Sequence, residues 1–72
     1  MSEEIKATIN KFITARTAQL VEMEVIKMTH ELKKTKADTD ELRAKSDMSI
    51  IKLNEAQEEL KREIELLNEL LA

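Results

Sequence analysis

Apolar residues recur along most of the chain at alternating steps of four and three residues, from Val21 to Leu60. This is the heptad spacing of a coiled coil, in which one stripe of a helix packs against a partner helix. The step from Leu60 to Ile64 adds a second interval of four, a stutter that locally relaxes supercoiling. The predicted helix-packing seam comprises Val21, Val25, Met28, Leu32, Thr35, Thr39, Leu42, Ser46, Ser49, Leu53, Ala56, Leu60, Ile64, Leu67 and Leu71.

The first 20 residues follow a different phase. Ile5, Ile9 and Phe12 fall on one line of a helix, and this line cannot share a straight stripe with Val21 and Val25. We therefore expect one coiled-coil domain in three parts. Residues 1–20 face a different or wider partner surface, residues 21–60 form regular heptads, and residues 61–72 follow the stutter.

The chain contains no glycine and no proline, the residues from which compact turns are usually made. A hairpin would have to break at a residue such as Asp38 or Ser46, and neither has turn-forming neighbours. The sequence thus predicts an all-α fold with a single long helix of about 100 Å, at 1.5 Å rise per residue. This helix would form a coiled coil, as a parallel dimer or a higher oligomer. Because the C-terminus stops among leucines without a cap, we expect a fragment of a longer protein.

Charges beside the seam favour a parallel, in-register pair of helices. In that arrangement Glu31 meets Lys36 of the neighbouring helix, and Asp38 meets Arg43. The distribution of charge between the halves points the other way. The first 36 residues hold seven Lys/Arg and five Asp/Glu, a net charge of +2, and the last 36 hold five and ten, a net charge of −5. Such asymmetry favours an antiparallel neighbour and stands against the parallel arrangement that we expect.

The middle of the seam is polar. Thr35, Thr39, Ser46 and Ser49 stand where large apolar residues are expected, and burying an unpaired hydroxyl costs roughly 1–3 kcal/mol. Off the seam, a second apolar face is formed by Met48, Ile50 and Ile51. A two-stranded dimer would leave this face in water, whereas a three- or four-helix assembly would cover it. The pattern therefore predicts missing partner helices.

Candidate chemistry is sparse. His30 is the only histidine, cysteine is absent and Phe12 is the only aromatic residue, so we expect a solvated histidine and no metal, cofactor or small-molecule ligand. The few basic residues before the heptads fall short of a basic leucine zipper, and nucleic-acid binding is not expected. No apolar run approaches the roughly 18–20 residues of a membrane span, which predicts no direct membrane insertion. With no pocket on a single helix, we expect no catalytic residues and no enzyme activity.

The segment Ile5-Lys6-Ala7-Thr8-Ile9 resembles the I-K-A-S-L type of opening of a known coiled-coil stalk. This is the stalk of the tumour susceptibility gene 101 protein family, the ubiquitin-recognising subunit of ESCRT-I. Further along, Glu31-Leu32, Lys34-Thr35 with Asp40-Glu41-Leu42, and the run from Leu60 to Leu71 are similar to its later segments. The chain departs from the pattern at Ala44 and Lys45, where the family commonly has glycine, and at Ser49 and Ala56, where leucines are usual.

The resemblance implies a scaffold helix that packs with helices of other ESCRT-I subunits. Such a protein would be cytoplasmic and endosome-associated, and would serve protein transport by sorting ubiquitinated cargo into multivesicular bodies. The family's ubiquitin-binding domain is not in these 72 residues, so no ubiquitin site is carried over. The alternative is a homo-oligomerising rod of a cytoskeletal, motor, SNARE or transcription protein.

Overall fold

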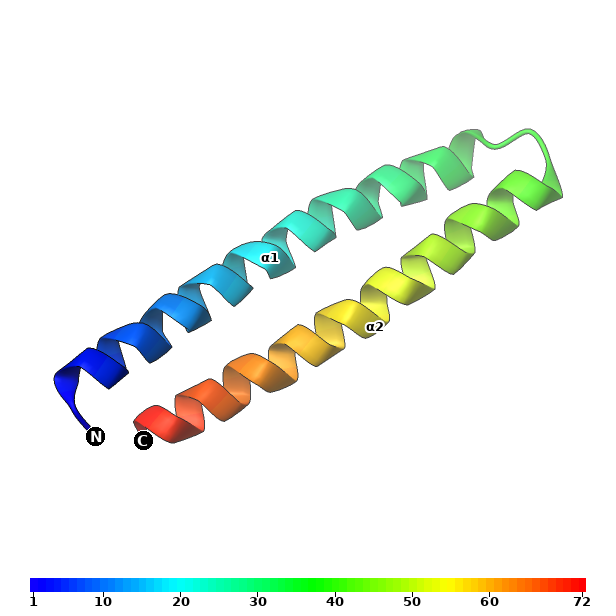
Figure 1. Ribbon diagram of the computed structural model, residues 1–72. Coiled ribbons are helices and arrows are strands. Elements are labelled where there is room, and N and C mark those ends of the chain that lie inside the picture. Colours follow the sequence, from blue (N-terminus) through cyan, green and yellow to red (C-terminus); the bar gives the residue numbers. More distant parts are fainter.

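The computed structural model describes residues 1–72 and contains two helices, α1 (Glu3–Lys36) and α2 (Asp40–Leu71). The helices lie side by side and antiparallel, with the N- and C-termini at the same end (Figure 1). The Cα atoms span 56 × 15 × 11 Å. The fold is all-α as expected, but the prediction of a single long helix of about 100 Å is wrong. The chain instead folds back on itself as a helical hairpin.

The turn between the helices is made without glycine or proline. Ala37 (φ −68°, ψ 132°) and Thr39 (φ −126°, ψ 155°) have extended backbone that any L-residue can adopt, and no residue has positive φ. The Thr39 Oγ1 atom accepts a hydrogen bond from the Leu42 N–H at 3.2 Å, which caps the start of α2. The expectation that a break near Asp38 lacks turn chemistry failed because extended backbone at Ala37 and Thr39, together with the Thr39 cap, is enough.

Charges on either side of the turn match the helix dipoles. The last turn of α1 is basic, with Lys33, Lys34 and Lys36. The first turn of α2 is acidic, with Asp40 and Glu41. Cations favour the C-terminal end of a helix and anions favour the N-terminal end. Arg43 adds a link across the turn, since its Nη1 donates to the Ala37 carbonyl at 3.2 Å. The sequence thus contains a helix stop followed at once by a helix start.

Few residues are buried between the helices. Only Ile9, Ser46 and Gln57 are less than one-tenth exposed, and around them lie two rows of half-buried side chains. The row on α1 comprises Ile9, Ile13, Arg16, Leu20, Met23, Lys27 and His30. It continues the phase of the first 20 residues along almost the whole of α1. The two phases seen in the sequence are therefore two faces of the same helix.

The row on α2 matches the C-terminal part of the predicted seam. Its buried or half-buried members include Ser46, Ser49, Leu53, Ala56, Leu60, Ile64, Leu67 and Leu71. These side chains lie against α1 of the same chain, not against a separate helix. The net-negative half of the sequence is thereby placed antiparallel to the net-positive half, which is the arrangement that the charge asymmetry favours.

Candidate helix-docking surface

The N-terminal part of the predicted seam lies outside the hairpin. Val21, Val25, Met28 and Leu32 are 60%, 58%, 58% and 56% exposed, and we call these four residues the outer stripe. Their spacing of four, three and four residues places them on one face of α1. That face points away from most of α2, because the row that begins at Ile9 occupies the contact, and only Leu32, near the turn, also borders a groove that α2 residues line. The outer stripe is thus an apolar coiled-coil surface with no helix on it.

The remaining residues predicted for the seam lie close to the turn. Thr35 is exposed near the end of α1, and Thr39 is the N-cap of α2. Leu42 is 49% exposed in the first turn of α2. Of the second apolar face, Met48 and Ile51 are exposed, whereas Ile50 is half-buried. The turn interrupts the heptads, so the seam residues that follow α1, Thr39 and Leu42, do not continue the outer stripe.

The charged residues predicted to pair between helices also lie at this end. Glu31 and Lys36 are exposed, and neither side chain forms an ion pair within the chain. Asp38 lies in the turn, so it has no helical neighbour across a seam. Arg43 pairs with Asp40 of its own helix. Glu31 and Lys36 are therefore left free beside the outer stripe.

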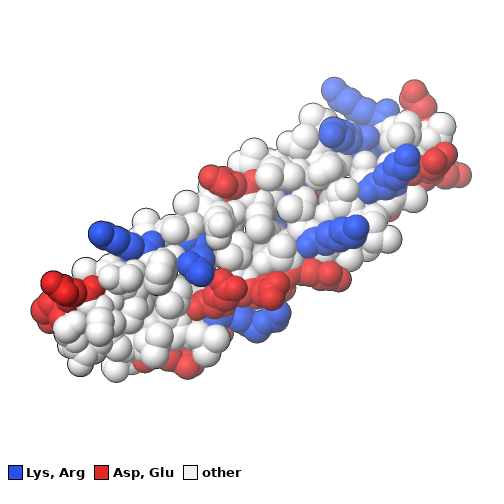
Figure 2. Space-filling model, in the orientation of Figure 1, with Lys and Arg blue, Asp and Glu red and all other residues white.

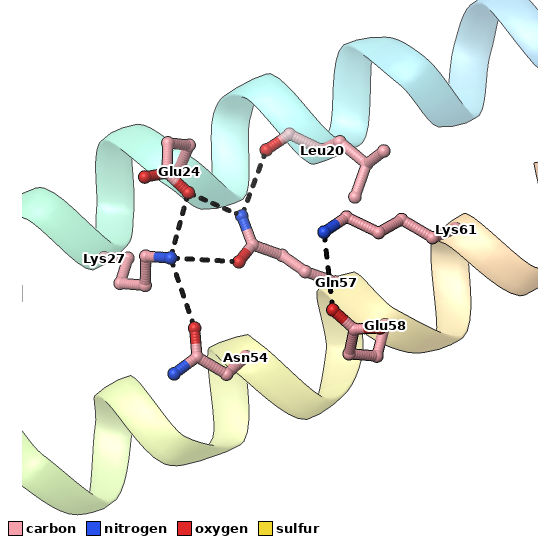
Figure 3. A network of polar contacts seen from close by, with 7 residues as sticks. All are labelled: Leu20, Glu24, Lys27, Asn54, Gln57, Glu58 and Lys61. Carbon is pink, nitrogen blue, oxygen red and sulfur yellow. Dashed lines mark hydrogen bonds and ion pairs between the residues drawn. The ribbon is translucent and has the colours of Figure 1, made fainter.

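A polar network lies between the helices near their middle (Figure 3). Gln57 is its buried member, and its Nε2 donates to Glu24 Oε2 at 2.9 Å and to the Leu20 carbonyl at 3.5 Å. Lys27 Nζ donates to Gln57 Oε1 at 3.3 Å and to Asn54 Oδ1 at 3.2 Å, and it pairs with Glu24 Oε2 at 3.0 Å. Each polar atom of the Gln57 side chain thus has a partner on α1, as burial requires.

The network changes the acidity of Glu24. The hydrogen bond from Gln57, followed by that from Lys27, stabilises the carboxylate and holds the pKa of Glu24 below its ordinary value. Reasoning from the sequence did not single out these residues. Gln57 follows Ala56 in the heptad pattern and reads as an ordinary flanking residue. Its role depends on which helix lies opposite, and the heptads alone do not specify that.

Two ion pairs between the helices lie on either side of the network. Arg16 Nε is 2.8 Å from Glu63 Oε2, and Lys34 Nζ is 2.6 Å from Asp47 Oδ1. The Arg16 guanidinium also lies 5.4 Å from the centre of the Phe12 ring, within cation–π range. Solvent-accessible ion pairs contribute about 0.2–1 kcal/mol each. These two partly exposed pairs therefore support the register of the hairpin more than its stability.

The hairpin has two shallow grooves. The larger, of about 610 Å³, lies at the turn, where half-buried His30 lines it together with Leu42, Ser49 and several lysines. The smaller, of about 220 Å³, lies at the other end beside Arg16 and Glu63. No group of three or more His, Cys, Asp or Glu side chains is placed to hold a metal ion. Neither helix combines the length and the apolar composition needed to cross a membrane.

A second group of exposed apolar side chains lies near the termini. Ile5, Phe12, Leu66 and Leu70 are each about half exposed, and we call them the open-end cluster. On the face shown in Figure 2, uncharged atoms cover most of this end, with Asp and Glu side chains at its tip, while Lys and Arg side chains are spread along the hairpin. The outer stripe of α1 and the open-end cluster are thus two groups of exposed apolar side chains, and Ile26, Leu42, Met48 and Ile51 are exposed outside them.

No family model, curated protein or solved structure matches this chain. Membership of the ESCRT-I stalk stays a prediction that rests on the sequence resemblance. The surface of the hairpin itself is the remaining indication of function.

Proposed function

We propose that the chain is a non-enzymatic assembly module, a helical hairpin that binds helices of other chains through its outer stripe. One observation carries the proposal: Val21, Val25, Met28 and Leu32 are each more than half exposed at heptad spacing on one face of α1. Fully burying one such side chain contributes about 1.5–3 kcal/mol. A partner helix on this face would therefore gain a substantial free energy of association.

The small interior of the hairpin supports the same proposal. Three of its 72 residues are buried, and polar side chains take part in the contact between its helices. Chains of this size rarely build a sufficient core from one packed layer, and association with other chains is a common remedy. We therefore expect the hairpin to gain much of its stability in an assembly.

The identity of the partner follows from the sequence resemblance only as a proposal. The partners would be helices of further copies of this chain and of other ESCRT-I subunits, and the chain would act in the cytoplasm at endosomes in the sorting of ubiquitinated cargo. The hairpin alters the geometry of that proposal. A stalk that contains this chain would have to accommodate two antiparallel helices from it in place of one continuous helix.

The test is the size of the native complex in extracts of cells that express the chain. We expect size-exclusion chromatography to place the wild-type chain in a particle larger than one hairpin, and Val25→Glu to move it to the size of a monomer. Ile26→Glu is the matched control, because Ile26 is also exposed but lies outside the stripe. Elution of the wild-type chain as a monomer, or an equal effect of both variants, would contradict the proposal.

A further inference from the structure

We infer that the partner on the outer stripe is a second copy of this hairpin, with the two α1 helices parallel and in register. The inference rests on the proposed function, since it names the partner of the same surface. Val25 and Leu32 then occupy a positions, while Val21 and Met28 occupy d positions, and each packs on the same residue of the other copy. The hairpins need not open, because the stripe faces away from α2.

Charge complementarity favours this partner. At the edges of the parallel pair, Glu31 occupies a g position and meets Lys36, at the following e position, of the second copy. Symmetry creates this attractive pair twice. Both side chains are exposed and form no ion pair within their own hairpin, so neither has to give up a partner when the copies meet.

The opposite orientation is less favourable. If the two stripes packed antiparallel, with Val25 against Met28 of the second copy, Glu22 would meet Lys36 and Glu24 would meet Glu31. The first contact is attractive, but the second places two carboxylates together, and symmetry repeats both. Like charges at such positions are destabilising. The parallel pair has the attractive contact between Glu31 and Lys36 and does not bring Glu24 against Glu31. We therefore favour the parallel pair.

Sedimentation equilibrium of the purified chain over a wide concentration range tests the inference. We expect a reversible dimer. Glu31→Lys should weaken it about tenfold, because two attractive contacts become repulsive, and Glu31→Lys with Lys36→Glu should restore most of the affinity. In the antiparallel pair Glu31→Lys would instead strengthen association, since it would place a lysine beside Glu24. Circular dichroism checks that the helicity of each variant is unchanged.

Cysteine cross-linking reports the orientation directly, because the chain has no cysteine of its own. Ala18 and Thr35 extend the stripe at its two ends and are exposed. Ala18→Cys should form a disulfide with its own copy in the parallel pair. In a mixture of Ala18→Cys and Thr35→Cys chains, disulfides only between the two variants would show antiparallel packing and overturn the inference.

The outcomes separate this inference from the proposed function. A purified chain that stays monomeric, while the complex in cell extracts still depends on Val25, would overturn the second copy as partner and leave the docking surface in place. If the purified chain stays monomeric and the complex in cell extracts does not depend on Val25, both proposals are overturned. A dimer that ignores Glu31→Lys would also overturn the parallel arrangement.

Discussion

Gln57 on α2 donates a hydrogen bond from Nε2 to the carboxylate of Glu24 on α1, at 2.9 Å. The amide is buried, and its oxygen accepts from Lys27 of α1. A buried amide that loses such partners costs stability, so this contact favours the register in which all three side chains meet. The network thereby specifies the hairpin, while the apolar residues of the contact supply cohesion.

Removal of the Gln57 amide should destabilise the hairpin. Gln57→Ala deletes the donor to Glu24 and the acceptor for Lys27, and we expect it to lower the free energy of unfolding by about 1–3 kcal/mol. Urea denaturation followed by circular dichroism measures this change. Gln19→Ala is the control, because Gln19 is exposed and makes no side-chain hydrogen bond, so it should change stability little. Equal effects of the two substitutions would show that the network does not stabilise the contact.

The pH dependence of stability should contain a contribution from Glu24. Its pKa is lowered in the folded chain by the hydrogen bonds from Gln57 and Lys27. The stabilisation is therefore fully present above the unfolded pKa of about 4.3, and it is lost as pH falls through the lower folded value. Unfolding measured between neutral and acidic pH should show a steeper loss of stability for wild type than for Glu24→Gln. Identical pH profiles would contradict this role.

The side-chain cap that Thr39 provides at the start of α2 should stabilise the hairpin measurably. Thr39→Ala removes the oxygen that accepts the Leu42 N–H, and we expect a loss of about 1 kcal/mol in the free energy of unfolding. Thr14→Ala serves as the control, because the Thr14 hydroxyl bonds only to the Asn10 carbonyl within α1. In thermal unfolding, the melting temperature of Thr39→Ala should be well below that of Thr14→Ala. The reverse order would indicate that another feature of residues 37–39 makes the turn.

The groove at the turn should accept a larger apolar residue. Ser49 is half-buried beside Leu42 in this groove, so Ser49→Leu should stabilise the hairpin by about 1–2 kcal/mol, part of the value of a fully buried leucine. Ser49→Ala separates this packing from the gain in helix propensity, which is a few tenths of a kcal/mol. If both variants melt at the same temperature, the leucine stays in solvent and the groove is not a packing defect.

The heptad pattern locates the apolar faces but not their partners. The seam residues from Ser46 to Leu71 do face a helix, yet that helix is α1 of the same chain. The residues from Val21 to Leu32 share the same spacing and remain outside, because Ile9 and the row that continues its phase occupy the contact. Periodicity is a local property of the sequence, whereas the choice between two apolar faces depends on the whole fold.

The sequence pattern did not predict the turn at residues 37–39, for a related reason. The absence of glycine and proline excludes turns that need positive φ or a fixed proline, but residues 37–39 use neither. The available signals were the lysines that end α1, the capping hydroxyl of Thr39 and the acids Asp40 and Glu41 that follow it. The heptad spacing, which continues through residues 37–39 with polar seam residues, obscured these signals. The charge asymmetry between the halves was the global sign of an antiparallel contact.

Everything proposed for the outer stripe depends on the chain folding back, and one distance tests this directly. Spin labels on Lys11→Cys and Glu69→Cys, both exposed, would report the separation by pulsed electron spin resonance. Labelled chains diluted in unlabelled chains exclude distances between copies. The hairpin predicts a short distance, since packed helix axes lie about 8–10 Å apart. One continuous helix would separate these positions by roughly 90 Å, and that result would contradict the hairpin.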